Sequence, residues 1–324
     1  MALRSFLFAP GNHARRVEKA LTLPADAVIL DLEDAVAISE KPATRELVVA
    51  AFGQPRQGRL YVRVNAYTTE WCYTDIVTIA RCGLDGIILP KVETADQLQS
   101  IDWLLANLER ERGLPVGGID LVPIIETALG MSNIGAIAGS GSRTKRLAFG
   151  AGDYTLDLGM VWSRDEAELL PARSAVVMAS RAAGIGPPLD TVWADLRDAE
   201  GFARSAERAA ALGFQGKMCI HPDQIAVTNA AFSPSAQQLT WANRVVAAFE
   251  EAEAKGLASI QLDGQFIDYP IVQRARQVVA RGARPDNSRG ARPDNSRGAR
   301  PDNSRGARPD NSRGARPDNS RGAV

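Results

Sequence analysis

The stretch LVPIIET, residues Leu121–Thr127, decides the fold of this chain. Its first five side chains are apolar, and the sixth, Glu126, is a carboxylate. An apolar run of this length is typical of a buried strand in a parallel sheet. A carboxylate at the end of such a strand is costly to bury unless it meets a cation or hydrogen-bond donors. The stretch therefore predicts a buried strand that delivers an acid to a polar site.

A second apolar run ends in the same way. RLAFGAG, Arg146–Gly152, leads directly into Asp153. Two carboxylates at two strand ends, with glycines beside the second, indicate a site for a hard divalent cation and room for a ligand close to the backbone. The alternative is that each acid faces water or caps a helix, because acidic side chains are mostly exposed.

Short apolar runs recur along the chain, and each is followed by a helical pattern. The predicted strands are Ser5–Ala9, Ala27–Leu32, Arg59–Asn65, Gly86–Leu89, Asp120–Thr127, Arg146–Asp153, Pro188–Trp193 and Gly216–His221. This alternation implies parallel strands joined by right-handed crossovers, and eight such units close into a (β/α)8 TIM barrel. An open doubly wound sheet is the alternative, but no glycine-rich dinucleotide fingerprint follows the first strand.

A barrel of this kind builds its site from the loops at the carboxyl ends of the strands. Most of the predicted strands are followed at that end by charged or titratable residues. These residues are Asp31, Glu33, Asp34, Arg63, Lys91, Glu93, Glu126, Asp153 and His221. Any one of them could be a helix cap or a solvated charge, but their shared position predicts a polar site at one mouth of the barrel.

Composition narrows the class of protein. The 324 residues are 45% hydrophobic, which supports a sizeable core. The formal charge is zero, but residues 282–321 hold 10 arginines and 5 aspartates, which leaves 28 basic and 33 acidic residues elsewhere. This mildly acidic remainder gives no argument for nucleic-acid binding. Three widely spaced cysteines form no zinc or redox motif, and no apolar run is long enough to span a membrane. We expect a cytoplasmic protein.

The chain divides into three predicted parts. Residues 1–232 form the catalytic barrel, and residues 233–281 form a C-terminal helical extension that carries Asp268. Residues 282–324 contain five copies of GARPDNSR, which offer no large apolar side chain to bury, so we expect a disordered tail. No aromatic side chains accompany its arginines, so we expect no nucleic-acid partner. A CoA- or RNA-binding protein that assembles through the tail is the alternative outside the enzymes.

Eight motifs in order carry a resemblance to a known family. They are LFAPGN, DLEDAV, RVN, LPKVE, IIET, FGAGDY, GKMCIHPDQ and FIDYP, spread between about Arg4 and Val279. In these motifs the chain resembles the citrate lyase β-subunit-like enzymes of the HpcH/HpaI aldolase superfamily, and most of all the stand-alone citramalyl-CoA and malyl-CoA lyases. The resemblance implies a TIM barrel, Mg2+ dependence with Mn2+ as an alternative, coenzyme A as part of the substrate, and a homotrimer.

The resemblance also implies roles for individual residues. The metal carboxylates fall on Glu126 and Asp153, and the substrate-binding arginine, which also has a catalytic role, falls on Arg63. The acid that protonates the product enolate falls on Asp268, which would act at the site of a neighbouring subunit; the alternative for Asp268 is an N-cap of the following helix. The CoA contacts fall on Phe8, Lys19, Ile220 and His221. His13 departs from the family, which often has Arg or Asp there.

The chemistry of a carbon–carbon lyase explains these residue types. A Lewis acid must hold the substrate hydroxyl and a carboxylate, and Mg2+ suits this with one or two protein carboxylates. Glu33 and Asp34 would hold its bound waters. The predicted enzyme cleaves a β-hydroxyacyl-CoA to acetyl-CoA or another acyl-CoA and a 2-oxo acid. The alternatives are a citrate lyase β-subunit, which cleaves a citryl carrier thioester to oxaloacetate, and a malate synthase or thioesterase variant. The sequence leaves the acyl group open.

Overall fold

The computed structural model of the chain describes residues 3–282. Of the predicted tail at 282–324, Gly282 ends a helix and residues 283–324 lie outside the described residues. Eight parallel strands close into a barrel in chain order, with β8 pairing back onto β1. The strands are β1 Ser5–Pro10, β2 Ala27–Asp31, β3 Arg59–Arg63, β4 Gly86–Leu89, β5 Asp120–Ile125, β6 Ala148–Phe149, β7 Leu189–Asp190 and β8 Gly216–Cys219. The predicted (β/α)8 barrel is confirmed.

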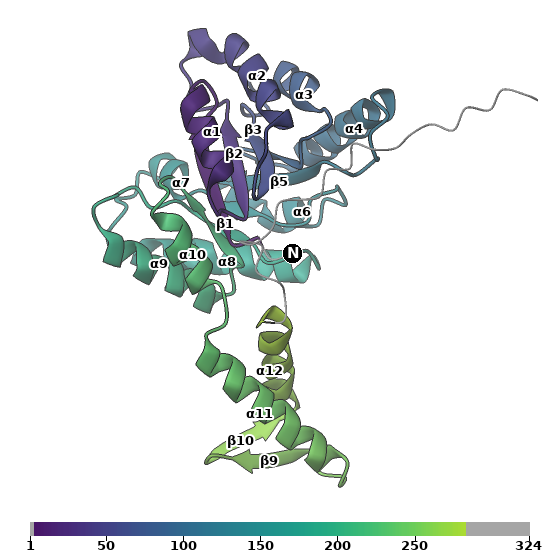
Figure 1. Cartoon of the computed structure of the whole chain (residues 1–324), viewed down its shortest axis with the longest axis vertical. Coiled ribbons are helices and arrows are strands. Elements are labelled where there is room, and N and C mark those ends of the chain that lie inside the picture. The colour runs from purple at the N-terminus through teal and green to yellow at the C-terminus, as the bar shows by residue number, and fades with distance from the viewer. Residues whose placement is uncertain (1–2, 283–324) are drawn as a thin grey trace, which may run out of the picture. The chain divides into compact units, whose positions relative to one another are not determined.

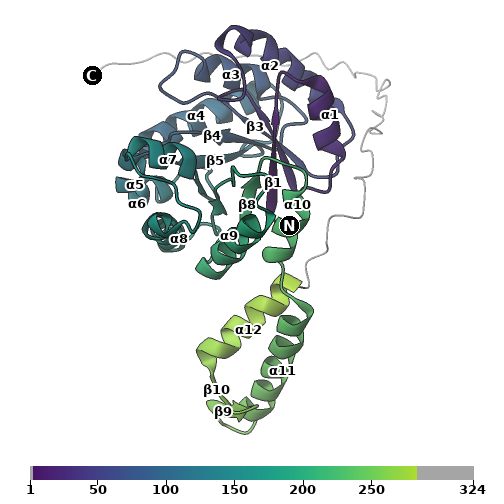
Figure 2. The ribbon, with the colours of Figure 1, turned by 90° about the vertical axis from the view of Figure 1, so that its left-hand side faces the viewer.

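Helices follow the strands and surround the barrel (Figures 1 and 2). They are α1 Ala14–Thr22, α2 Lys41–Ala50, α3 Cys72–Ile79, α4 Ala95–Glu111, α5 Ala128–Ser132, α6 Ile134–Ala138, α7 Ala151–Asp157, α8 Leu170–Ala182, α9 Ala199–Leu212 and α10 Gln224–Ala231. Local sequence sets where they begin. At α4, for example, Thr94 and Gln97 form a reciprocal capping box, which satisfies two backbone donors at the helix start.

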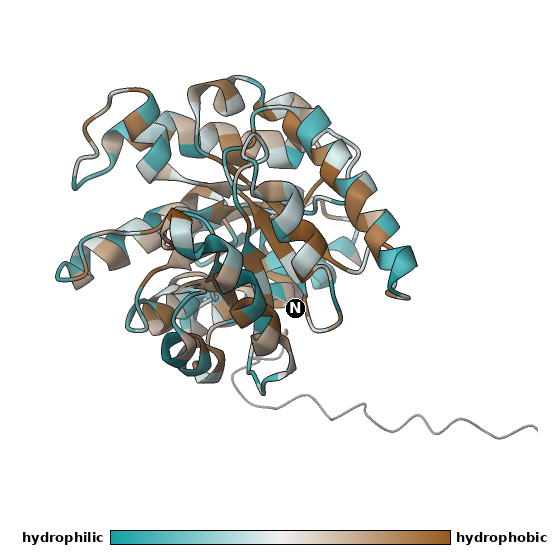
Figure 3. Ribbon diagram, turned by 90° about the horizontal axis from the view of Figure 1, so that it is seen from above, coloured by the Kyte–Doolittle hydropathy of each residue, from teal (hydrophilic) through white to brown (hydrophobic). Residues whose placement is uncertain are grey.

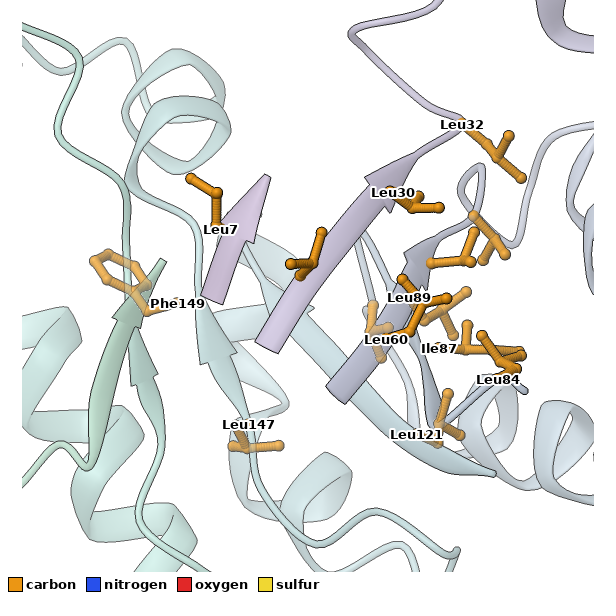
Figure 4. Close-up of a cluster of buried hydrophobic side chains, with 14 of the residues drawn as sticks. Leu7, Leu30, Leu32, Leu60, Leu84, Ile87, Leu89, Leu121, Leu147 and Phe149 are labelled. Atoms are coloured by element: carbon orange, nitrogen blue, oxygen red, sulfur yellow. The ribbon is translucent and has the colours of Figure 1, made fainter. Parts of the chain in front are cut away.

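Two apolar layers hold the barrel together, and alternate residues of each strand belong to different layers. In β2, Val28 and Leu30 join the layer between strands and helices, whereas Ala27 and Ile29 join the layer inside the barrel. Figure 4 shows side chains of the outer layer, including Leu30. The hydropathy colouring in Figure 3 places strongly hydrophobic segments among the central strands. This period of two fixes which residues can reach the barrel mouth.

The structure corrects the predicted lengths of two strands, and the strand predicted at Pro188–Trp193 is reduced to Leu189–Asp190. The apolar run at 146–153 contributes only Ala148–Phe149 to the sheet, and Asp153 lies in the first turn of α7 rather than at a strand end. The chain leaves the barrel at Gly150, whose N–H donates to the carbonyl of Ile125, and enters the helix at Ala151. Apolar content alone could not separate a strand from the buried start of a helix.

The C-terminal extension contains a hairpin that the sequence analysis missed. Helices α11 Ala236–Glu253 and α12 Tyr269–Gly282 flank β9 Ser259–Leu262 and β10 Gln265–Asp268, and Figure 1 shows the two helices side by side with the hairpin at one end. The extension has its own apolar core, built from Ala242, Val245, Phe249, Ile267, Val272 and Ala275. The helical prediction was therefore incomplete, and the predicted domain boundaries stay a prediction.

A fully buried ion network braces the barrel beside β7 and β8. Arg173 of α8 donates to both carboxylate oxygens of Glu166 at 2.9 and 3.0 Å, and its Nε lies 2.8 Å from Asp190. Lys217 Nζ lies 2.6 Å from the other oxygen of Asp190. Burial alone would raise the pKa of Asp190, but Lys217 and Arg173 outweigh it and hold that pKa below its usual value.

Replacing Arg173 by methionine should lower the free energy of unfolding by about 3–5 kcal/mol, because it leaves buried carboxylates without their partner. Urea unfolding followed by circular dichroism measures the change. Arg181→Met, at the exposed last turn of the same helix, is the control and should change stability by less than about 0.5 kcal/mol. Equal stability of the two variants would contradict the structural role of the network.

None of the helices within residues 3–282 is long and apolar enough to cross a membrane.

Candidate active site at the barrel mouth

The inward-facing positions of several strands end in polar side chains at the same mouth. In β2 the inward series Ala27 and Ile29 continues to Asp31, and in β3 Tyr61 is followed two residues later by Arg63. In β5, Val122 and Ile124 of the inner layer are followed at the same spacing by the predicted metal ligand, Glu126. Because side chains alternate between the two faces of each strand, Asp31, Arg63 and Glu126 all point toward the same mouth of the barrel.

Glu126 is buried at the end of β5, with 4% of its surface exposed. Its Oε1 accepts a hydrogen bond of 2.9 Å from the backbone N–H of Lys91. Burial raises the pKa of Glu126 to about 8, and the charges of Glu33 and Asp153 add to the shift, while Arg63 and Lys91 oppose it. Glu126 therefore lies among other carboxylates, and a bound cation would offset the repulsion between them.

Gly150 makes room for the second oxygen of Glu126. A Cβ atom placed on Gly150 would collide with Glu126 Oε2 and press on Ile124. Asp153, the other predicted metal ligand, lies three residues later on α7 and is about one third exposed. Gly150 therefore lets Glu126 pack against the backbone of this loop, and the room for a bound ligand that the sequence suggested stays a prediction.

Arg63 is held by a neighbouring acid. Its Nε and Nη2 lie 2.7 and 2.6 Å from the two carboxylate oxygens of Asp31, a bidentate pair. Burial alone would raise the pKa of Asp31, but Arg63 outweighs it and holds that pKa below its usual value. Arg63 Nη1 lies 2.9 Å from Glu33, and the guanidinium stacks over the ring of Phe8 at 4.9 Å. Asp31 therefore fixes the plane of the arginine.

Glu33, Asp34 and Lys91 complete the cluster. Lys91 Nζ lies 2.6 Å from Glu33, 3.4 Å from Asp153 and 3.8 Å from Asp34. Glu33 is buried, and its burial raises its pKa despite Arg63 and Lys91, whereas Asp34 is mostly exposed. The structure thus brings both acids that were predicted to hold metal-bound water into contact with the predicted metal ligand through one ammonium.

A buried lysine anchors the loop that carries these acids. Lys41 Nζ donates to the carbonyls of Leu32 and Glu33 at 2.9 and 2.8 Å, and to Asn65 Oδ1 at 2.6 Å. Asn65 in turn donates to Asp75. Three acceptors around one ammonium fix the backbone from which Glu33 projects. The sequence analysis missed Lys41 because an isolated lysine in a helix reads as a surface residue.

The predicted CoA contacts lie on β1, on α1 and in the loop after β8. Phe8 is partly buried under Arg63, and Lys19 is exposed on α1. Ile220 and His221 follow β8, where the N–H of Ile220 donates to Gln224; Ile220 is exposed and His221 is half-buried. Of these residues, Phe8 is the one joined to the carboxylate cluster by an observed contact. The CoA roles stay a prediction.

Asp268 ends β10, in the extension. Its Oδ1 accepts from the N–H of Ile271 at 3.3 Å, and its backbone pairs with Ser259 of β9. It therefore caps α12, which was the alternative weighed from the sequence. The cap uses Oδ1, so Oδ2 can still take part in a proton transfer. Its contacts lie within the extension, so its catalytic role stays a prediction.

The donor set suits a divalent cation with few protein ligands. Residues 3–282 contain no group of three or more His, Cys, Asp or Glu side chains arranged to hold a metal ion by themselves. Mg2+ does not need such a group, because it commonly binds one or two carboxylates and keeps several waters. At the mouth, five carboxylates, those of Asp31, Glu33, Asp34, Glu126 and Asp153, face the cations of Arg63 and Lys91. This excess of negative charge fits the predicted pair Glu126 and Asp153.

Comparisons with known proteins identify the family of the chain, whereas the roles of the individual site residues stay a prediction. The family model described as HpcH/HpaI aldolase/citrate lyase matches residues 4–222. The citrate lyase subunit beta of Leuconostoc mesenteroides subsp. cremoris is 40% identical over 278 residues, which cover 85% of this chain and 92% of that protein. A (3S)-malyl-CoA thioesterase of Cereibacter sphaeroides is 36% identical over 280 residues, covering 86% and 94%.

A solved structure of similar fold and sequence indicates the same family. The protein CitE from Mycobacterium tuberculosis, in complex with magnesium, acetoacetate and coenzyme A, superposes with a TM-score of 0.72 at 33% identity, covering 87% of this chain and 99% of that one. The resemblance found in the eight motifs is confirmed. The chain therefore belongs to the HpcH/HpaI aldolase/citrate lyase family and is an enzyme of the lyase class.

Proposed function

We propose that the chain is an Mg2+-dependent carbon–carbon lyase. Its substrate is a β-hydroxyacyl-CoA such as citramalyl-CoA or malyl-CoA, and its products are acetyl-CoA or another acyl-CoA and a 2-oxo acid. The observation that carries the proposal is the cluster at the barrel mouth, where the carboxylates of Glu33, Glu126 and Asp153 meet Arg63 and Lys91. The magnesium and coenzyme A in the solved CitE complex support it.

Glu126 and Asp153 would hold the metal, with Mn2+ as an alternative to Mg2+. When bound, the ion would supply Lewis-acid stabilisation of the negative charge that develops on the substrate oxygens. Glu33 and Asp34 would accept hydrogen bonds from water around the ion, since both lie against Lys91 beside Asp153. Gly150 has no Cβ, so Glu126 Oε2 can lie against the backbone at this position.

Arg63 would bind the substrate carboxylate and offset the charge of the enolate. Its bidentate contact with Asp31 fixes the guanidinium plane before substrate arrives, so little reorganisation is needed during the reaction. Phe8 would support this plane and, with Lys19, Ile220 and His221, would contact coenzyme A. The proton of the substrate hydroxyl would pass to a carboxylate at the mouth, and the oxygen would form the carbonyl of the 2-oxo acid. The carbon–carbon bond would then break, and the electron pair of that bond would enter the thioester enolate.

Asp268 would protonate that enolate as the acyl-CoA forms. It lies in an extension with its own core, so a homotrimer in which the extension of one subunit serves the barrel of the next would complete each site. A general acid in this position contributes roughly 10²–10⁴-fold to the rate. The absence of a strongly basic folded part and the cytoplasmic expectation both fit a small-molecule enzyme without a nucleic-acid partner.

A citrate lyase β-subunit, acting on a carrier thioester, is the second candidate, because the Leuconostoc mesenteroides relative of that name is 40% identical. The Cereibacter sphaeroides relative keeps a thioesterase variant open as well. Asp268 favours the stand-alone lyases, with which the resemblance places that acid.

A substrate panel separates these functions. Purified full-length protein is incubated with citramalyl-CoA, malyl-CoA and citryl-CoA, with Mg2+ or with EDTA. Released 2-oxo acid is measured with lactate or malate dehydrogenase, and free thiol with a colorimetric reagent. We expect 2-oxo acid without free CoA thiol in Mg2+ and none in EDTA. Free thiol would indicate hydrolysis, and no turnover without a partner subunit would indicate a citrate lyase component.

A further inference from the structure

Lys91 contacts the proposed metal ligands with both its backbone and its side chain. Its φ is +51°, a left-handed backbone conformation that residues other than glycine rarely adopt. In this conformation its N–H donates to Glu126 Oε1, and the N–H of the next residue, Val92, donates to the carbonyl of Ile124. Strained residues persist where surrounding contacts hold them, and they cluster at functional sites.

The side chain of Lys91 places its charge among the acids. Its Nζ lies 2.6 Å from Glu33 Oε1, 3.4 Å from Asp153 Oδ2 and 3.8 Å from Asp34 Oδ2. The Lys91 side chain is about two-thirds buried, so its attraction to these carboxylates is screened less than at an open surface. One positive charge thus serves three acids.

We propose that the Lys91 ammonium competes with the divalent cation for these carboxylates and so sets the affinity of the metal site. The inference rests on the proposed function, in which Asp153 and Glu126 hold the metal. An ion bound to Asp153 would face an ammonium within a few ångströms, and like charges at that distance repel strongly. Lys91 would therefore have to give up its contact with Asp153 when the metal binds, while its contact with Glu33 could remain.

This competition has a consequence for each state of the enzyme. With Mg2+ absent, Lys91 neutralises part of the charge of the acids and keeps them together. With Mg2+ bound, the charge of Lys91 lowers the affinity of the carboxylates for the ion. This lower affinity favours an ion that binds together with substrate oxygens. The role is that of a positioning and affinity-setting residue, not of a group that reacts with substrate.

Mg2+ titration by isothermal calorimetry of EDTA-treated full-length protein tests the inference. Lys91→Met removes the charge and keeps most of the side chain, so we expect its dissociation constant to fall by about tenfold or more. Lys91→Arg keeps the charge and should stay close to the wild type. Lys255→Met, at an exposed lysine in the turn after α11, is the matched control and should leave the Mg2+ dissociation constant unchanged. An equal or larger dissociation constant in Lys91→Met overturns the inference.

A second variant protects the test against misfolding. Lys91→Gly removes the ammonium and adopts a positive φ without strain, so it should fold and should also bind Mg2+ more tightly. Melting temperatures give an independent readout, because both neutral variants should melt lower in EDTA and gain more from Mg2+ than the wild type. Failure of the wild type and both variants to bind Mg2+ would overturn the metal pair of the proposed function. Wild-type binding that Asp153→Asn abolishes, with unchanged affinity in the Lys91 variants, would overturn only this inference.

Discussion

Glu126→Gln is expected to lower Mg2+-dependent cleavage by at least about a thousandfold, the order of effect seen when a group that stabilises developing charge is lost. The amide keeps the shape of Glu126 and can still accept the hydrogen bond from Lys91 N–H, so the fold should remain. Initial rates on the best substrate of the panel, at saturating Mg2+, measure the loss. Turnover within about tenfold of the wild type would reject Glu126 as a metal ligand.

The same variant should be more stable than the wild type in EDTA at alkaline pH. The pKa of Glu126 is about 8 in the folded protein against an ordinary value of 4.5, so folding favours the protonated form. The contribution of protonated Glu126 to the stability of the wild type is full below about pH 4.5, falls as pH rises, and is gone above about pH 8. Each unit of pKa difference between the folded and unfolded states is worth about 1.4 kcal/mol. Glutamine does not titrate and escapes this loss.

Melting temperatures between pH 5 and 9 check this prediction. The gap between Glu126→Gln and the wild type should widen up to about pH 8 and then stay constant. Glu46→Gln, an exposed acid on α2, should show no such gap. Mg2+ should narrow the gap by stabilising the ionised wild type, so a gap that is independent of pH would argue against a buried, destabilising carboxylate at this position.

Asp268→Asn is expected to lower kcat by roughly 10²–10⁴-fold with little change in KM, because it removes a proton donor and no binding group. Asparagine caps a helix as well as aspartate does, so the bond to Ile271 N–H and the start of α12 should survive. Asp263→Asn, at the tip of the same hairpin, is the control and should keep full activity. A simultaneous rise in KM would indicate a structural role instead.

Mixing inactive variants tests whether the site is shared. If the extension of one subunit serves the barrel of another, co-expression of Asp268→Asn with Glu126→Gln should restore up to about a quarter of the wild-type activity, since randomly assembled rings contain some intact pairs. If each extension serves its own barrel, the mixture should stay inactive. Recovery of activity therefore distinguishes the two arrangements without a structure of the assembly.

Much of the barrel mouth could be predicted from the sequence. Asp31, Arg63 and Glu126 follow apolar strands at inward-facing positions, and a strict period of two leaves little choice of direction. Loops obey no such period. The sequence could not show that Asp31 occupies the fork of Arg63, or that Lys91 turns back into the cluster through a positive φ. Both depend on contacts between segments far apart in the chain.

The extension shows what a closer reading of the sequence would have found. Asp263-Gly264 lies between SIQL, which alternates polar and apolar residues, and QFID, and this dipeptide is a strong signal for a tight hairpin turn. The structure gives both residues the positive φ that such a turn requires, +49° and +78°. The length of the β6 strand was a harder problem, because the residues at 146–152 are equally suited to a strand and to the buried start of α7.

The alternation of the strands limits how this chain can change over generations. Loss of one codon inside β2 or β5 would leave the reading frame intact, yet every later side chain of that strand would exchange sides. Asp31 or Glu126 would then point into the apolar layer between the strands and the helices, and a leucine or isoleucine would line the barrel mouth instead. Descendants of this gene should therefore accept length changes between the strands far more readily than within them.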